Sequence, residues 1–158
     1  MNSPIETLER KGFRLPAAPK PVASYVPAVC TGSLLFVSGQ LPFQEGKVLA
    51  TGPVPSQCTP ENAAGAARQC VLNALAVVGE HVGGDWSRVT RIVRLGVFVQ
   101  SDPGFAGQPA VANGASDLLV ELFGDAGRHA RAAVGVNALP LQAAVELELV
   151  AEIRPVLT

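Results

Sequence analysis

The clearest pattern in the chain is a strict alternation of aliphatic and mostly polar residues near its C-terminal end. From Val145 to Ile153 every second residue is aliphatic, and three of the four residues between them are glutamates. A period of two sends successive side chains to opposite faces of a strand. The pattern therefore predicts a half-buried strand with one aliphatic face and one acidic face, the latter carrying Glu146, Glu148 and Glu152.

A second strand-like segment, about Arg131 to Ala138, precedes this one, and Leu139-Pro140-Leu141 lies between the two. Proline cannot donate to a central ladder, so it marks a connection. We therefore expect the two segments to pair as a hairpin. In that register the face of Arg131 aligns with the acidic face of the last strand.

The expected hairpin raises a problem of distance. Glu146 would lie opposite Asn137, which is six residues from Arg131, or roughly 20 Å along a strand. One flat hairpin would not bring Arg131 and Glu146 together. Either a bulge shifts the register, or a second chain completes the site.

The remaining apolar runs predict one α+β domain, a mixed sheet with two helices packed on one face. The run from Leu34 to Val37 is apolar enough to be buried on both faces, which predicts a central strand. Thr59 with Pro60, and Ser3 with Pro4, are typical of helix starts, and Gly83 and Gly84 are typical of the end of the helix that Thr59 begins. We expect strands at about 26–30, 34–40, 47–50 and 89–100, helices at about 3–11, 59–82 and 110–123, and an N-terminal extension over 1–14 of a single domain 1–158.

Composition narrows the classes of function. Only 16% of the residues are charged while 48% are hydrophobic, so a monomer would expose much apolar surface and we expect self-association. The net charge of −1 and the scattered basic residues disfavour a nucleic-acid surface. No apolar run approaches about eighteen residues, so we expect no membrane partner. The first residues are polar, unlike a signal peptide, and the three cysteines show no pairing pattern and suit a reducing compartment. We therefore expect a cytoplasmic protein.

Arg131 and Glu146 are the first candidates for chemistry. The neighbours of Arg131 on its strand face, Ala133 and Gly135, are small, which leaves room for a ligand carboxylate against the guanidinium. The alternative for Arg131 is a structural ion pair with Glu148 or Glu152. If Glu146 is desolvated beside Glu148, its pKa rises and it becomes a plausible proton acceptor; the alternative is a solvated carboxylate.

Further candidates are Tyr25, Ser38, Gly39 and His129. Tyr25 is the single tyrosine, and Gly39 lets a ligand approach the backbone at the end of an apolar strand. Their alternatives are a core tyrosine and a strand-ending turn. His129 shares the strand face of Arg131 and is expected at the mouth of a cleft. The run 113–117 either caps or kinks a helix, or turns Asn113 or Ser116 into a neighbour's cleft. Two histidines without clustered ligands predict no metal site.

These residues resemble a known family. The family signature is carried by Tyr25, by Ser38-Gly39-Gln40-Leu41-Pro42, by Arg131, by Leu139-Pro140, and by Val145-Glu146-Leu147-Glu148. Together they resemble the YjgF/RidA family of reactive-intermediate deaminases, over about residues 15–154. The resemblance implies a chorismate-mutase-like fold, a homotrimer with clefts between subunits, and no cofactor. It also implies catalytic roles for Glu146 and Tyr25, and substrate contacts from Arg131, Ser38, Gly39 and Ala133, with Ser116 and His129 as further candidates.

The residues and this resemblance leave three candidate functions. The first is hydrolysis of short-lived 2-imino or enamine acids to 2-keto acids and ammonia, with Arg131 holding the carboxylate. The second is a binding protein for a small carboxylate metabolite, because Pro27 and Ala133 depart from the family pattern around the pocket. The third, an endoribonuclease or translation inhibitor, rests on family labels alone, with the charge and the sparse aromatics against it.

Overall fold

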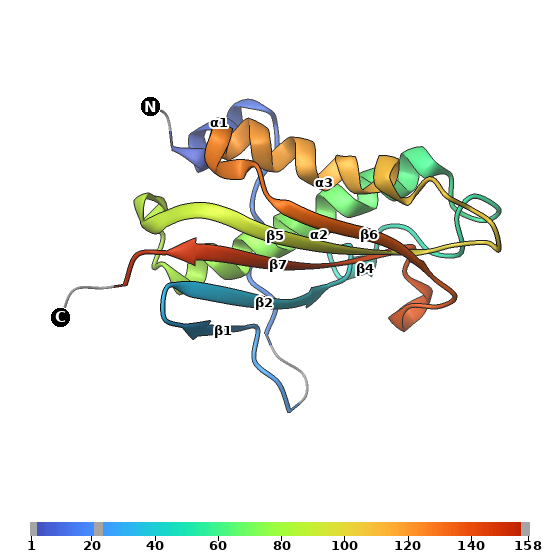
Figure 1. The fold of residues 1–158 in the computed structure, drawn as a ribbon, viewed down its shortest axis with the longest axis horizontal. Helices are drawn as coiled ribbons and strands as arrows, with labels where there is room; N and C mark the ends of the chain where they lie inside the picture. The colour runs from blue at the N-terminus through green and yellow to red at the C-terminus, as the bar shows by residue number, and fades with distance from the viewer. Residues whose placement is uncertain (1–2, 21–23, 156–158) are drawn as a thin grey trace.

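The computed structural model describes residues 3–20 and 24–155, and its centre is a mixed five-stranded sheet in the order β1-β2-β7-β5-β6. Figure 1 shows the strands side by side. All neighbours are antiparallel except β5 and β6, which are parallel. The strands are β1 (Ala28–Thr31), β2 (Leu34–Gln40), β5 (Val89–Gln100), β6 (Ala130–Val136) and β7 (Val145–Ile153), and a separate small ribbon pairs β3 (Phe43–Gln44) with β4 (Lys47–Val48).

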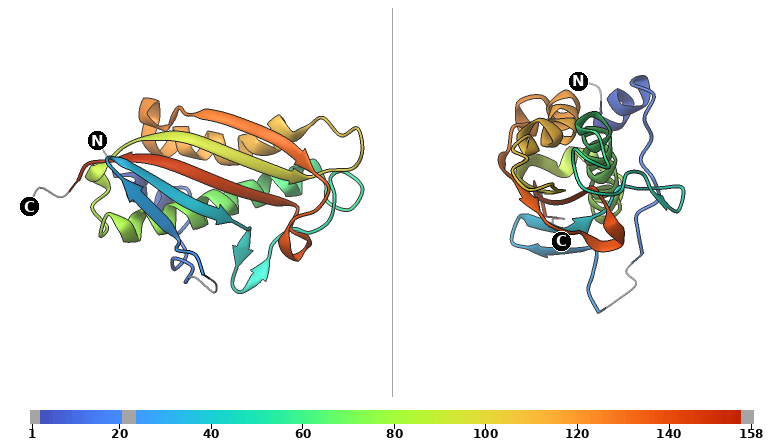
Figure 2. Two further views of the ribbon diagram at one scale, coloured as in Figure 1. Left: turned by 60° about the horizontal axis from the view of Figure 1, so that its bottom comes forward. Right: turned by 90° about the vertical axis from the view of Figure 1, so that its right-hand side faces the viewer.

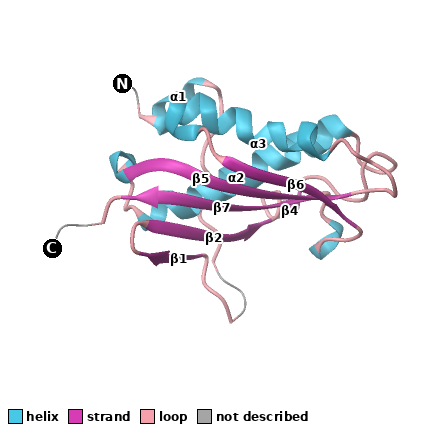
Figure 3. Cartoon of the chain, in the orientation of Figure 1, coloured by secondary structure: helices cyan, strands magenta, loops and turns pink. Residues whose placement is uncertain are grey.

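Helices lie on one face of this sheet (Figures 1 and 3), and the described residues form three α-helices at the three predicted positions. Ser3 caps α1 (Pro4–Arg10) through a capping box, and Thr59 caps α2 (Pro60–His81) by accepting from the backbone of Asn62. Both starts agree with the sequence patterns. The others are α3 (Gln108–Phe123) and the short 3₁₀ helices η1 (Trp86–Arg88), η2 (Gly124–Gly127) and η3 (Pro140–Gln142). Two of the α-helices, α2 and α3, contact the strands, and the short α1 contacts α3.

The last strand confirms the predicted alternation. Burial along β7 alternates at every residue, with Val145 to Ile153 inward at odd positions and Glu146, Glu148, Val150 and Glu152 half-buried on the other face. The aliphatic face of β7 packs beneath the helices and joins a continuous core of buried residues from α2, α3 and the sheet. This burial is the main force that sets the register of β7.

The expected hairpin between residues 131–138 and 145–153 is wrong. β5 lies between β6 and β7, and β6 pairs with β5 in parallel. The physical reason is the crossover through α3, which packs on the face already covered by α2 and returns the chain beside β5 in the same direction. The connection at Pro140 then carries the chain past β5 to its other edge, with Leu141 and Gln142 in left-handed conformations at φ 55° and 58°.

The expectation that 34–37 is buried on both faces also fails in the single chain. Leu35 and Val37 face the core, but Phe36 is 44% exposed on the opposite face. Val29 of β1 and Val134 of β6 are exposed there as well, at 55% and 46%. Figure 2 shows that none of the helices formed by the described residues covers this face. The sheet therefore has one covered face and one open face that is partly apolar.

The contact between α2 and α3 gives a prediction about stability. A Cβ on Gly114 would overlap the backbone carbonyl of Ala64, so the two helices touch through their backbones. We expect Gly114→Ala to lower the free energy of unfolding by about 1–3 kcal/mol because the helices must separate. A Cβ on Gly65 of α2 meets nothing within 4 Å, so Gly65→Ala should be neutral or stabilising by about 0.5–1 kcal/mol. Denaturant unfolding of both variants is the measurement; equal losses would contradict the close packing.

Candidate functional site

Arg131 lies on the edge strand β6 and points toward the helices. Its register partner on β5 is Leu95, whose partner on β7 is Leu149, and both leucines are buried in the core. Directly paired residues share a face of the sheet. Arg131 therefore belongs to the helix-covered face, at the edge where β6 has no further strand beside it among the described residues.

The guanidinium of Arg131 is held by uncharged partners. Its Nη1 donates to Asn113 Oδ1 at 2.8 Å and to Ser116 Oγ at 3.1 Å, both on α3. In the described part of the chain Arg131 forms no ion pair, and Nε and Nη2 have no hydrogen-bond partner. Nε and Nη2 form the edge that a carboxylate can bind with two parallel hydrogen bonds.

The alternative role of Arg131 as a structural ion-pair partner of Glu148 is not what the structure shows. Glu148 pairs with Arg94 of β5, with Arg94 Nη1 2.9 Å from Glu148 Oε1. Both lie on the open face, because Glu148 is opposite Gly96 and alternates with the buried leucines of β7. The sheet itself thus separates Arg131 from the glutamates.

Behind Arg131, a serine and a histidine are in direct contact. Ser116 Oγ lies 2.9 Å from His129 Nε2, and His129 Nδ1 lies 2.6 Å from the carbonyl oxygen of Gly127. Burial lowers the pKa of His129 below its ordinary value, and the nearby charge of Arg131 lowers it further, against the Gly127 carbonyl, which acts to raise it. The net shift favours the neutral form of His129.

Glu146 occupies a different place, on the open face of β7 beside the end of β2. A Cβ on Gly39 would overlap Glu146 Oε1, so glycine at this position makes room for the carboxylate. The register of β2 against β7 shifts between Val37 and Gln40, which places Ser38 and Gly39 in an irregularity of the strand. Burial raises the pKa of Glu146, and repulsion from Glu148 raises it further.

Ser38 and Tyr25 complete this second group. Ser38 Oγ donates to the carbonyl of Val26 at 2.7 Å, and Ser38 N donates to the carbonyl of Pro27 at 2.9 Å. These bonds tie the segment that carries Tyr25 to the end of β2. Tyr25 is 53% exposed and, with Gly39 among others, lines a cleft of about 260 Å³. The core-tyrosine alternative is thus wrong.

The predicted residues therefore form two groups rather than one site. Arg131, Ser116 and His129, with Asn113, lie at the β6 edge on the helix side, and Ala133 packs partly into the core nearby. The other group is Tyr25, Ser38, Gly39 and Glu146. Two strands, β7 and β5, separate β2 from β6, which is about 14 Å at ordinary strand spacing. The predicted 20 Å register between Arg131 and Glu146 does not exist, because their strands are not paired.

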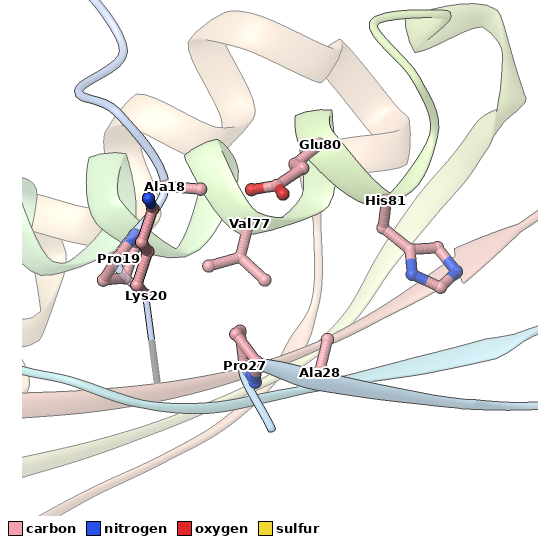
Figure 4. Close-up of a pocket in the computed structure, with 8 residues that line it drawn as sticks. All are labelled: Ala18, Pro19, Lys20, Pro27, Ala28, Val77, Glu80 and His81. Carbon is pink, nitrogen blue, oxygen red and sulfur yellow. The ribbon is translucent and has the colours of Figure 1, made fainter. Parts of the chain in front are cut away.

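A larger cleft of about 390 Å³ lies elsewhere, between α2 and the chain before β1. Figure 4 shows Glu80 and His81 of α2 and Lys20 of the N-terminal segment around it. No residue proposed above for chemistry lines this cleft. Over the described residues there is also no group of three or more potential metal ligands and no helix suited to crossing a membrane.

Sequence reasoning missed the mutual contacts of Asn113, Ser116, His129 and Arg131. The run 113–117 neither caps nor kinks a helix, because α3 runs through it from Gln108 to Phe123. Asn113 and Ser116 are three residues apart and so share a helix face. That spacing was a signal for one polar face, but not for which strand would lie against it.

Comparison with known proteins agrees with this architecture. Residues 6–153 match the family described as "YjgF/chorismate_mutase-like, putative endoribonuclease". The chain is 46% identical over 148 residues to Protein TCP17 of Trypanosoma cruzi, covering 93% of this chain and 92% of that one. It is 30% identical over 140 residues to a 2-iminobutanoate/2-iminopropanoate deaminase of Dermatophagoides farinae, covering 88% and 93%.

Among solved structures, the protein Atu1372 of Agrobacterium tumefaciens, of unknown function, superimposes with a TM-score of 0.90 at 43% identity, covering 96% of this chain and 94% of that one. The match thus includes most of the N-terminal segment as well as the sheet. With the sheet order, the glycine beside Glu146 and the position of Arg131, these similarities place the chain in the YjgF/RidA family.

Proposed function

We propose that this protein hydrolyses short-lived 2-imino acids, or their enamine tautomers, to 2-keto acids and ammonia. The observation that carries the proposal is the state of Arg131. Its Nη1 is anchored by neutral side chains, and within the described residues Arg131 has no carboxylate partner and no hydrogen bond from its Nε–Nη2 edge. A cation held in this way is suited to bind a carboxylate from outside the chain.

The reaction needs one positioned water and one proton acceptor. With the substrate carboxylate on Arg131, water adds to the carbon of the C=N bond while Glu146 accepts a proton from that water. Glu146 returns that proton to the nitrogen, which gives a carbinolamine. The hydroxyl proton then also passes to the nitrogen, the C–N bond breaks, the carbonyl forms and ammonia leaves. The raised pKa of Glu146 brings it nearer to neutral pH, which suits a group that accepts and returns a proton.

The same proposal requires a second copy of the chain, since the two groups lie on opposite faces of one sheet. We propose a homotrimer in which the open face of each sheet, with Phe36, Val29 and Val134, meets a neighbour. The Arg131 edge of one subunit would then complete the group of Tyr25, Ser38, Gly39 and Glu146 on the next. Burial of these exposed apolar side chains supplies a driving force for the assembly.

The similarity to the mite deaminase supports this reaction class. The side chain of Ala133, two residues after Arg131, is small and carries no reactive group. The proposed mechanism therefore involves no reactive side chain at position 133. Hydrolysis of an imine needs few catalytic groups. Positioning of the water and proton transfer through one side chain each raise the rate by large factors, and the proposed reaction uses no cofactor.

The test is a coupled assay with a pyridoxal-phosphate dehydratase that releases 2-iminobutanoate or 2-iminopropanoate. We expect the wild-type protein to accelerate the appearance of the 2-keto acid over spontaneous hydrolysis. Thermal stabilisation by 2-keto acids without any acceleration would instead identify a carboxylate-binding protein. Cleavage of RNA without any effect on imine hydrolysis would contradict both carboxylate-based functions.

A further inference from the structure

The contacts around Ser116 have only one consistent direction. A guanidinium can only donate, so Ser116 Oγ accepts from Arg131, and a carbonyl can only accept, so His129 Nδ1 carries the proton toward Gly127. In a neutral imidazole Nε2 then carries no proton, so the Ser116 hydroxyl donates a hydrogen bond to it. The result is a directed chain from Arg131 through Ser116 and His129 to the Gly127 carbonyl.

A serine beside a neutral histidine that is oriented by a third group also suits a nucleophile and its base. The surroundings of Ser116 disfavour that role. Ser116 lies in the middle of α3 (Gln108–Phe123), so its backbone N–H and those of its neighbours bond within the helix. No backbone donors are left beside Ser116 to stabilise an oxyanion, and its oxygen already accepts from Arg131.

We propose that Ser116 and His129 are positioning residues that hold the Arg131 guanidinium in the orientation for carboxylate binding, and that this hold depends on a neutral His129. The inference rests on the proposed function, because it assigns Arg131 to a substrate carboxylate. One N–H of Arg131 Nη1 donates to Asn113 Oδ1, and the other donates to Ser116 Oγ. Both N–H groups of Nη1 are thus bonded to α3, which leaves the Nε–Nη2 edge for a ligand.

Protonation of His129 would reverse the chain at Ser116. The imidazolium Nε2 would become a donor, so two cations would point at the same serine oxygen. The charged group that acts on His129 is Arg131, two residues later in β6. From α3 the Ser116 hydroxyl contacts His129, and from η2 the Gly127 carbonyl does, and both groups are neutral. The neutral form of His129 is favoured in the folded protein. The Arg131 guanidinium is therefore fully fixed by Ser116 at pH values above the pKa of His129, and this fixation weakens as the pH falls through that pKa.

The test measures binding of 2-oxobutanoate to the full chain by calorimetry from about pH 5 to about pH 8, across the range in which histidine titrates. Wild-type affinity should be constant near neutral pH and weaken on the acid side. Ser116→Ala should weaken binding about tenfold at neutral pH, the loss expected for one hydrogen bond to a charged group. Ser116→Thr keeps the hydroxyl and should restore affinity.

His129→Gln separates the pH effect from a structural one. Glutamine offers an uncharged acceptor in place of Nε2, so this variant should bind like the wild type at neutral pH and lose the acid-side weakening. If Arg131→Ala abolishes binding while Ser116→Ala and His129→Gln match the wild type at every pH, the positioning role is wrong and the proposed function stands. If Arg131→Ala binds like the wild type, both are wrong.

Discussion

Arg131→Ala is expected to lower kcat/KM for 2-imino acids by roughly 100- to 1,000-fold, because it removes two hydrogen bonds between charged groups. The loss should appear in the coupled dehydratase assay, with the spontaneous rate subtracted. The fold should survive, because Arg131 is exposed and contributes no ion pair within the described residues. An unchanged thermal midpoint would show that the loss belongs to the site.

Two further variants sharpen this result. Arg131→Lys keeps the charge but cannot bind a carboxylate with a planar pair of donors, so we expect activity between those of the wild type and the alanine variant. Arg128→Ala makes the same change of charge three residues earlier, where the side chain pairs with Asp125 in solvent. It should leave activity within about twofold, since exposed ion pairs contribute little. Equal losses in Arg128→Ala and Arg131→Ala would mean that general charge, not the anchored guanidinium, supports activity.

Mixing two inactive variants should restore activity, and this is the second large effect that we expect. Glu146→Gln removes the proton acceptor and Arg131→Ala removes the carboxylate contact, so each homo-oligomer should be nearly inactive. If each site joins Arg131 of one subunit to Glu146 of the next, random mixing of equal amounts restores about one quarter of the sites, for any closed ring. The chains must be unfolded and refolded together so that subunits exchange.

The mixing experiment distinguishes the arrangement of the site from its chemistry. A site built within one chain would give no recovery, because every subunit would still lack one of the two groups. Separately refolded variants, combined afterwards, are the control for activity that does not depend on exchange. Light scattering of the wild type gives the number of subunits directly, and a monomer at assay concentrations would contradict the shared site.

The positions of Gly39 and Gly96 connect the fold to the proposed chemistry. A Cβ on Gly39 would overlap Glu146, and a Cβ on Gly96 would lie 2.7 Å from Glu148 Oε1. Each carboxylate thus lies against the sheet where a neighbouring strand has no side chain. Glu148 is neutralised there by Arg94, whereas Glu146 forms no ion pair within the described residues and has a raised pKa. Two adjacent glutamates on one strand face therefore have different roles available to them.

Local patterns predicted most elements of this fold. The caps at Ser3 and Thr59, the strand bounds of β2 and β5, and the alternation along β7 all follow from interactions within a few residues of sequence. The failures were pairings. A proline connection before β7 is equally consistent with a turn to the adjacent strand and with a step across one strand, and only the packing of α3 on the sheet decides between them.

The sequence by itself determined the family, the half-buried last strand and the residue types needed to bind a carboxylate, since these depend on composition and short spacings. Only the tertiary structure decided that Arg131 faces α3 while Glu146 faces the open side. The face on which Arg131 lies is set by the pairing of β6 with β5 and of β5 with β7. The contact of Ser116 with His129 likewise depends on how a helix is seated against a strand. Such long-range packing is set by the whole core, and no local pattern encodes it.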